Sequence, residues 1–314
     1  MPSANRSKSL TDEGIAAPHI PVMLSEVLSL LDISDERKPL RFVDCTVGAG
    51  GHSEAMLNAL SGGGFYLGLD RDENALAIAT PRLESYLDAT HRLVHSAFDE
   101  VATVLGTEKI TGGLLADLGV SSMQLDEGER GFSFKADAPL DMRMDTTVGQ
   151  SAAELLAIAS EAQLADWFFT YGEERHSRAI AKRLVEERQK TPFATTKQLA
   201  DCIQHFAAKK SSGERWRIHP ATRVFQALRI AVNDELGQLE RVLAALPTIM
   251  ASGSVATFIS FHSLEDRLVK HAFHDWERDG LGRRLTKKPL VATDAEQAVN
   301  PRSRSAKLRG FVFT

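Results

Sequence analysis

The chain has 314 residues, of which 43% are hydrophobic and 25% charged, and its formal net charge is −5 at pH 7. These values are typical of a soluble globular protein with one large or two ordinary domains. The negative total excludes a protein that attracts nucleic acid through its overall charge. A nucleic-acid partner would have to bind local clusters of basic residues.

Cysteine usage and hydropathy predict a cytoplasmic protein without a membrane span. The two cysteines, Cys45 and Cys202, lie far apart and without metal-ligand spacing, so neither a disulfide framework nor a metal site is expected. Residues 1–17 are polar and small, predict a loose tail, and lack the apolar core of a secretory signal. The longest uncharged stretch, residues 242–264, is interrupted by Pro247 and Gly253, which indicates a helix end, a turn and a buried strand.

Short apolar runs indicate five β-strands, and segments with helical spacing separate the first four. The predicted strands cover residues 40–44, 65–70, 92–95, 113–117 and 255–261; the predicted helices between them cover 53–60, 73–86 and 99–105, after a first helix over 22–31. Strands that alternate with helices predict an α/β fold, with a parallel sheet covered on both faces.

The alternation stops after the fourth strand, and residues 151–246 show only helical patterning. Ser151 and Glu154 form a predicted capping box, Thr196 can cap a helix starting near Gln198, and Pro220 suits a first helical turn. The simplest interpretation is an all-helical domain, residues 128–246, inserted into an α/β domain built from residues 18–127 and 247–314.

A glycine-rich turn follows the first predicted strand. Asp44, Gly48 and Gly50 fall at the carboxyl end of that strand, where open α/β sheets bind ligands, and glycines let backbone amides approach a ligand closely. Asp70 ends the second strand, 20 residues after Gly50, where an acid can accept hydrogen bonds from ribose hydroxyls. A tight turn without a ligand would explain the glycines alone, but together with Asp70 they predict an adenosine-containing cofactor.

The composition of the turn favours S-adenosylmethionine over a nicotinamide dinucleotide. The dinucleotide fingerprint has a third glycine or alanine where this chain has Ser53. The turn also lacks lysine and arginine, so a pyrophosphate would find little charge there beyond the helix N-terminus. A sulfonium cofactor carries no phosphate and is compatible with a nearby carboxylate such as Asp44.

Eight motifs in fixed order carry a resemblance to a known family. They are residues 19–24 (HIPVML), 117–122 (DLGVSS), 124–126 (QLD), 130–134 (RGFSF), 139–145 (PLDMRMD), 219–230 (HPATRVFQALRI), 260–267 (SFHSLEDR) and 300–309 (NPRSRSAKLR). This set resembles the RsmH (MraW) family of methyltransferases, which modify N4 of a P-site cytidine in small-subunit ribosomal RNA. The resemblance covers about residues 19–310.

The resemblance implies a Rossmann-like S-adenosylmethionine-dependent methyltransferase sheet with an inserted all-helical domain. The family's cofactor contacts correspond here to Gly50, Gly51, His52, Asp70, Phe98, Asp117 and Gln124. Gly50, Gly51 and His52 would line the methionine end, Asp70 would hold the ribose, and Phe98 would cover the adenine, although Phe98 alone would suit a core aromatic. The chain departs from the family at Met123, where proline is common, and at Ala49, where many members have arginine.

Methyl transfer to the cytosine amine requires an acceptor that directs the nitrogen lone pair at the methyl group. Many amino-methyltransferases use an Asn/Asp-Pro-Pro-aromatic sequence after the fourth strand, but this chain has residues 117–120 (DLGV) there. Our catalytic candidates are Asp117, Asp141 and His262. Asp141 would equally suit a salt bridge to Arg143, and His262 a position at the start of a helix.

Two basic clusters are candidates for binding 16S ribosomal RNA in the small ribosomal subunit. They contain Arg217, His219 and Arg223 in the first and Arg302, Arg304 and Lys307 in the second, and either would also suit a solvated surface. The target base would have to turn out of its stack to reach the cofactor. Alternative functions are a methyltransferase for a protein or small molecule and a non-catalytic RNA-binding factor. The oligomeric state, a homodimer included, is left open.

Overall fold

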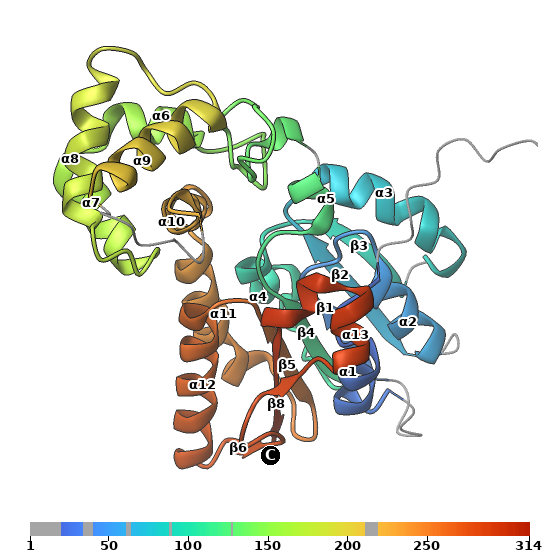
Figure 1. Cartoon of the computed structure of the whole chain (residues 1–314). Coiled ribbons are helices and arrows are strands. Elements are labelled where there is room, and N and C mark those ends of the chain that lie inside the picture. The colour runs from blue at the N-terminus through green and yellow to red at the C-terminus, as the bar shows by residue number, and fades with distance from the viewer. Residues whose placement is uncertain (1–19, 34–39, 61–63, 88–89, 127, 211–218) are drawn as a thin grey trace, which may run out of the picture.

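The computed structural model describes residues 20–33, 40–60, 64–87, 90–126, 128–210 and 219–314. Within these residues the chain forms an eight-stranded sheet of order β3-β2-β1-β4-β5-β8-β6, with β7 paired to β8 (Figure 1). The strands are β1 Arg41–Asp44, β2 Phe65–Asp70, β3 His91–His95, β4 Gly113–Asp117, β5 Val255–Ser260, β6 Gly282–Arg284, β7 Leu290–Val291 and β8 Lys307–Phe313.

The five predicted strands are confirmed, and they pair in parallel. The sequence analysis missed the antiparallel edge formed by β6, β7 and β8. Strand β8 pairs along the whole of β5, from Val255 opposite Val312 to Ser260 opposite Lys307. The sequence of this segment predicts a basic cluster, but Leu308, Phe311 and Phe313 are buried and form part of the strand.

The helices of the described residues cover the sheet and build the insert. They are α1 Leu24–Leu31, α2 Gly51–Leu60, α3 Glu73–Leu83, α4 Val101–Leu105, α5 Ser122–Asp126, α6 Ala152–Ile158, α7 Glu161–Thr170, α8 Ser177–Arg188, α9 Thr196–Lys210, α10 Ala221–Asn233, α11 Glu235–Ile249, α12 Ser263–Arg278 and α13 Asp294–Val299. The predicted capping box is confirmed, since Ser151 Oγ accepts from the Glu154 amide and the Glu154 carboxylate accepts from the Ser151 amide.

Apolar packing confirms an α/β sheet covered on both faces. Buried residues of α4, α11 and α12 pack on one face, and those of α1, α2 and α3 pack on the other (Figure 1). A third cluster, from Phe132 to Leu228, holds the helical block α6–α10 together. The expected insert extended to residue 246, but Leu239, Val242 and Leu246 of α11 pack with the sheet. The division into two domains stays a prediction.

The parallel strands bring three acidic residues to one edge. Asp44, Asp70 and Asp117 are the last residues of β1, β2 and β4, which are neighbours in the sheet, so their side chains gather at the carboxyl edge. The helical block lies at the upper left in Figure 1, beyond the sheet.

Candidate active site

A cavity of about 320 Å³ opens at the carboxyl edge of the sheet. Its wall is formed by the glycine turn, the ends of β2 and β4, the segment from β4 into α5, and the start of α11. Six of the seven predicted cofactor contacts line it, namely Gly51, His52, Asp70, Phe98, Asp117 and Gln124. Gly50 is not among the lining residues and instead faces α3, where an added Cβ would lie 3.3 Å from the Cβ of Ala79.

The glycine turn is fixed by hydrogen bonds to the strand-end carboxylates. The Gly48 amide donates to Oδ2 of Asp70 at 2.7 Å, and the fully buried hydroxyl of Ser53 donates to Oδ2 of Asp44 at 2.8 Å. Gly48 and Gly50 have φ values of 53° and 80°, which favour glycine. Ser53, which distinguishes this turn from the dinucleotide fingerprint, is therefore the partner of a buried carboxylate.

The N-terminal motif closes the cavity from the other side. Pro21 lies against Gly51, where an added Cβ would meet the proline Cγ at 3.2 Å. Nε2 of His52 lies 2.9 Å from the carbonyl oxygen of Val22, which directs the opposite ring nitrogen, Nδ1, toward Asp117 at 3.8 Å. The first motif thus fixes the orientation of His52 in the cavity wall.

Asp70 and Asp117 lie beside the cavity in a poorly hydrated environment. Burial raises the pKa of Asp70 to about 6, against the opposing effect of amide hydrogen bonds from Asp72 and Gly48. Burial, and then the charges of Asp44 and Glu265, raise the pKa of Asp117 well above its usual range. Oδ1 of Asp117 is buried and has no hydrogen-bond partner in the part of the chain that the structure describes. A donor group on a ligand would satisfy it.

Sequence comparison now identifies the family. The MraW methylase family matches residues 16–313. The chain belongs to the MraW methylase family. The ribosomal RNA small subunit methyltransferase H of Geotalea uraniireducens is 45% identical, over 93% of this chain and 97% of that protein. Its counterpart from Synechocystis sp. is 50% identical, over 85% of each chain. The crystal structure of an rRNA methylase from Streptococcus thermophilus aligns over 95% of this chain and 99% of that one, with 9% identity and a TM-score of 0.43.

Membership of the MraW methylase family confirms the expected enzyme class, a methyltransferase that uses S-adenosylmethionine. The sheet confirms the Rossmann-like fold. No helix among the described residues is both long and apolar enough to cross a membrane.

The pKa of Asp70 leads to a pH prediction for this methylase. An ionised carboxylate accepts hydrogen bonds from ribose hydroxyls more strongly than a protonated one. Because the pKa of Asp70 in the fold is about 6, we expect the affinity for S-adenosylmethionine to rise between pH 5 and 7 and then level off. Calorimetric titration across this range measures it. Burial also raises the pKa of Asp44 to about 6, so both carboxylates titrate in the same pH range. The Asp70→Asn variant separates them, because it removes only the titration of Asp70. An unchanged pH profile in that variant would refute the assignment.

Gln124 lines the cavity, and hydrogen bonds to other residues hold its side chain in place. Its Nε2 donates to Oδ2 of Asp72 at 2.7 Å, and its Oε1 accepts from the Ser121 amide at 3.0 Å. Phe98 is partly buried and lines the cavity from the single turn of 3-10 helix that precedes α4. These contacts give Gln124 a role in fixing the loop after β4, beside any contact with the cofactor.

Two of the three catalytic candidates lie outside the cavity lining. Asp141 forms a double hydrogen bond with Arg143, at 2.8 Å from each oxygen, as the alternative interpretation predicted. Burial opposes ionisation of Asp141, but its hydrogen bonds with Arg143 outweigh burial and lower its pKa. His262 is the N-cap of α12, and its Nε2 lies 3.0 Å from Oε1 of Glu265. Only Asp117 of the three lines the cavity.

The basic candidates differ in how they are held. Arg302 lines the cavity and Arg304 is exposed, whereas Lys307, at the start of β8, pairs with Asp266 of α12 at 3.2 Å. His219 lies against the ring of Phe134 with centroids 4.7 Å apart. Arg223 is about half exposed, 3.8 Å from the Glu174 carboxylate. Arg217 lies outside the described residues.

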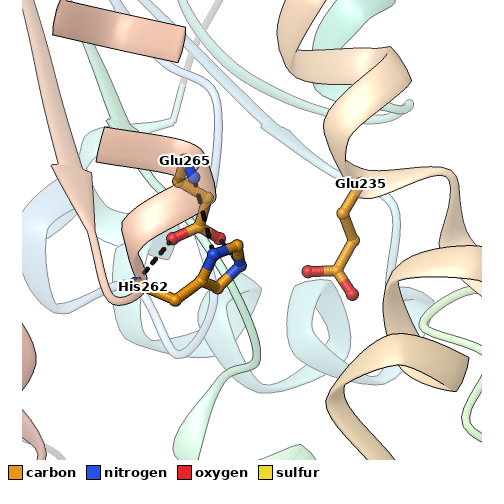
Figure 2. A group of neighbouring side chains, drawn as sticks. All are labelled: Glu235, His262 and Glu265. Carbon is orange, nitrogen blue, oxygen red and sulfur yellow. Dashed lines mark hydrogen bonds and ion pairs between the residues drawn. The ribbon is translucent and has the colours of Figure 1, made fainter. Parts of the chain in front are cut away.

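A charged group that was not among the predicted site residues shares the cavity with Asp117. Arg229, Glu235 and Glu265 line the cavity, and Glu235 and Glu265 lie close to His262 (Figure 2). Glu265 falls inside the 260–267 motif and Arg229 inside the 219–230 motif, which was the available signal. Glu235 lies in no motif and had no sequence signal. It meets its partner Arg229 only because the chain turns between α10 and α11 at Asp234, where φ is 49°.

Proposed function

We propose that this chain transfers a methyl group from S-adenosylmethionine to the N4 amine of a P-site cytidine in 16S ribosomal RNA of the small ribosomal subunit. The observation that supports it most is Asp117, whose buried and unsatisfied Oδ1 borders the same cavity as Asp70. A ribose acceptor and an amine acceptor in one cavity suit a reaction between an adenosine cofactor and an amino group.

The residues of the cavity suit this cofactor. Asp70 is available to ribose hydroxyls, the Phe98 ring to the adenine face, and the turn at Gly51 to the methionine end. When bound, S-adenosylmethionine supplies a methyl group whose bond to sulfur breaks as the bond to nitrogen forms, and it leaves as S-adenosylhomocysteine. The nitrogen then carries one proton too many, and the ionised form of Asp117 accepts it; the raised pKa of this group makes that carboxylate a stronger base than an ordinary aspartate.

Ribosomal RNA is the substrate class that the relatives' names and the surface charges support. The proteins from Geotalea and Synechocystis are named ribosomal RNA small subunit methyltransferase H. Arg302 at the cavity and the exposed side chains of Arg304 and Arg223 offer cations to an RNA backbone near the site. Lys307, held by Asp266, would contribute less to RNA binding.

The Asp70→Ala variant tests the cofactor half of the proposal. Loss of hydrogen bonds from ribose to a carboxylate is expected to weaken S-adenosylmethionine binding roughly 10–100-fold. Isothermal titration calorimetry measures the dissociation constant. The matched control is Asp275→Ala, which removes a half-exposed carboxylate on α12. Equal affinities in both variants would remove Asp70 from the cofactor site.

Product analysis tests the reaction itself. Purified protein is incubated with methyl-labelled S-adenosylmethionine and small subunits from a strain that lacks the modification, and the RNA is then digested to nucleosides. Label in N4-methylcytidine is the expected result. Label in another nucleoside or in protein would support a different methyltransferase, and tight binding of subunits without turnover would support a non-catalytic factor.

A further inference from the structure

The cavity has a second polar wall beyond the predicted cofactor contacts. Glu265 at the start of α12 and Glu235 at the start of α11 are 2% and 8% exposed, and both line the cavity. Figure 2 shows the Glu235 carboxylate facing the His262–Glu265 pair from the other helix. The wall adjoins the end of β4, because a Cβ added to Gly119 would lie 3.9 Å from Oε1 of Glu265 and 3.7 Å from the Phe261 ring.

Glu265 and Arg229 present an acceptor beside a donor. Oε2 of Glu265 accepts from the amides of Phe261 and His262 at 2.8 and 3.2 Å, which fixes the carboxylate in the cavity wall. Nε and Nη2 of Arg229 donate to Glu235 at 2.7 and 2.8 Å. These are the hydrogen bonds that the described residues give the Arg229 guanidinium, so its Nη1 keeps its protons for a ligand.

A metal ion suits this wall less well, although ligand atoms of Glu235, His262 and Glu265 lie within 4.8 Å of one another. Nδ1 of His262 accepts from the Glu265 amide, so in the neutral ring the proton is on Nε2, which then has no lone pair for a metal. Both Glu235 oxygens already bind Arg229, whose fixed positive charge would repel a cation.

We propose that Glu265 and Arg229 read the target base: Glu265 accepts a hydrogen bond from its exocyclic amine, and Arg229 donates one to the neighbouring ring nitrogen. His262 and Glu235 are positioning residues that hold these two. The inference rests on the proposed function, which supplies cytosine as the base. Cytosine offers a donor at N4 and an acceptor at N3, whereas uracil offers the reverse pattern and would set its O4 against a carboxylate.

The pKa values of Glu265 and Asp117, the two carboxylates near the proposed position of the amine, are shifted in opposite directions. Burial opposes ionisation of Glu265, but the hydrogen bond from His262 and the positive charge of Arg229 outweigh it and lower its pKa. The pKa of Asp117 is raised instead. Glu265 therefore stays an ionised acceptor that orients the amine, while Asp117, once it has taken the proton in its ionised form, holds that proton more strongly.

The test compares binding of two short RNAs that differ in one group. One carries the target cytidine, and the other carries 2-pyrimidinone at that position, which lacks the amine. The wild-type protein, loaded with S-adenosylhomocysteine, is expected to bind the cytidine RNA roughly 10-fold more tightly or better. Glu265→Gln is expected to abolish most of this difference while leaving cofactor affinity unchanged, and Arg229→Lys is expected to weaken binding of both RNAs.

Controls separate folding, metal binding and the proposed function. Glutamine at position 265 can still complete the capping box of α12, and the unfolding midpoint of the variant, measured beside the wild type, shows whether it folds. Glu277→Gln, further along α12 and paired with Arg284, should keep the full preference. A Glu265→Gln variant that folds and retains the amine preference would overturn the inference, as would a stoichiometric metal ion that is lost in that variant. Failure of wild-type protein to form N4-methylcytidine in small subunits, with the amine preference intact, would overturn only the proposed function.

Discussion

Replacing Asp117 by alanine is expected to lower kcat for methyl transfer by about 100–1,000-fold, the range typical of removing one preorganised hydrogen-bonding group that acts in the transition state. Asp117 has a buried oxygen without a partner and borders the cavity at the end of β4. Single-turnover assays on small subunits measure the chemical step. Separate calorimetry of S-adenosylmethionine binding shows how much of the loss comes from the cofactor site.

The Asp117→Asn variant refines the result. Asparagine retains an acceptor oxygen but does not accept a proton at neutral pH, so it should recover cofactor affinity more than it recovers kcat. Asp275→Ala on the exposed side of α12 is the control for removal of a carboxylate. A kcat within a factor of two of wild type in Asp117→Ala would contradict the assignment.

The second large effect is expected on stability. Nη2 of Arg130 lies 3.0 Å from Oδ2 of Asp72, with side chains 10% and 5% exposed, and it also donates to the carbonyls of Arg143 and Met144. Removing one partner of a buried pair leaves an uncompensated charge. Arg130→Ala should lower the free energy of unfolding by about 3 kcal/mol, measured by urea denaturation followed by tryptophan fluorescence.

The same substitution also probes the link between the two parts of the chain. Asp72 caps α3 beside the cofactor edge, whereas Arg143 and Met144 belong to the segment leading into the helical block. Arg278→Ala breaks an exposed pair on α12 and should leave the urea midpoint unchanged. If both variants unfolded at the same urea concentration, the Arg130 pair would be shown to contribute nothing.

Sequence patterns predicted those elements of the structure that are set by residues close to one another along the chain. Four of the five parallel strands are mostly buried and therefore appear as short apolar runs, whereas β3 lies at the sheet edge and keeps a shorter apolar centre. The capping box at Ser151 is complete within four residues. The glycine turn and Asp70 were recognisable because the end of a parallel strand dictates where a ligand can bind. The helix end and strand within residues 242–264 were found for the same reason, since α11 ends at Ile249 and β5 begins at Val255.

The tertiary structure alone decided which charged residues face the cavity. The sequence offers Asp141 and Asp117 equally as catalytic candidates. In the structure Arg143 forms hydrogen bonds with the Asp141 carboxylate, whereas no described residue forms one with Oδ1 of Asp117. Glu235 and Glu265 meet because α11 and α12 pack side by side on the sheet. The antiparallel strand β8 places Lys307 beside Asp266, an ion pair that the basic cluster in the sequence does not indicate; its contact with RNA stays a prediction. The sequence determined the five parallel strands, the turn and the family; long-range packing, which no local pattern encodes, determined the antiparallel edge and which acids and bases are left to react.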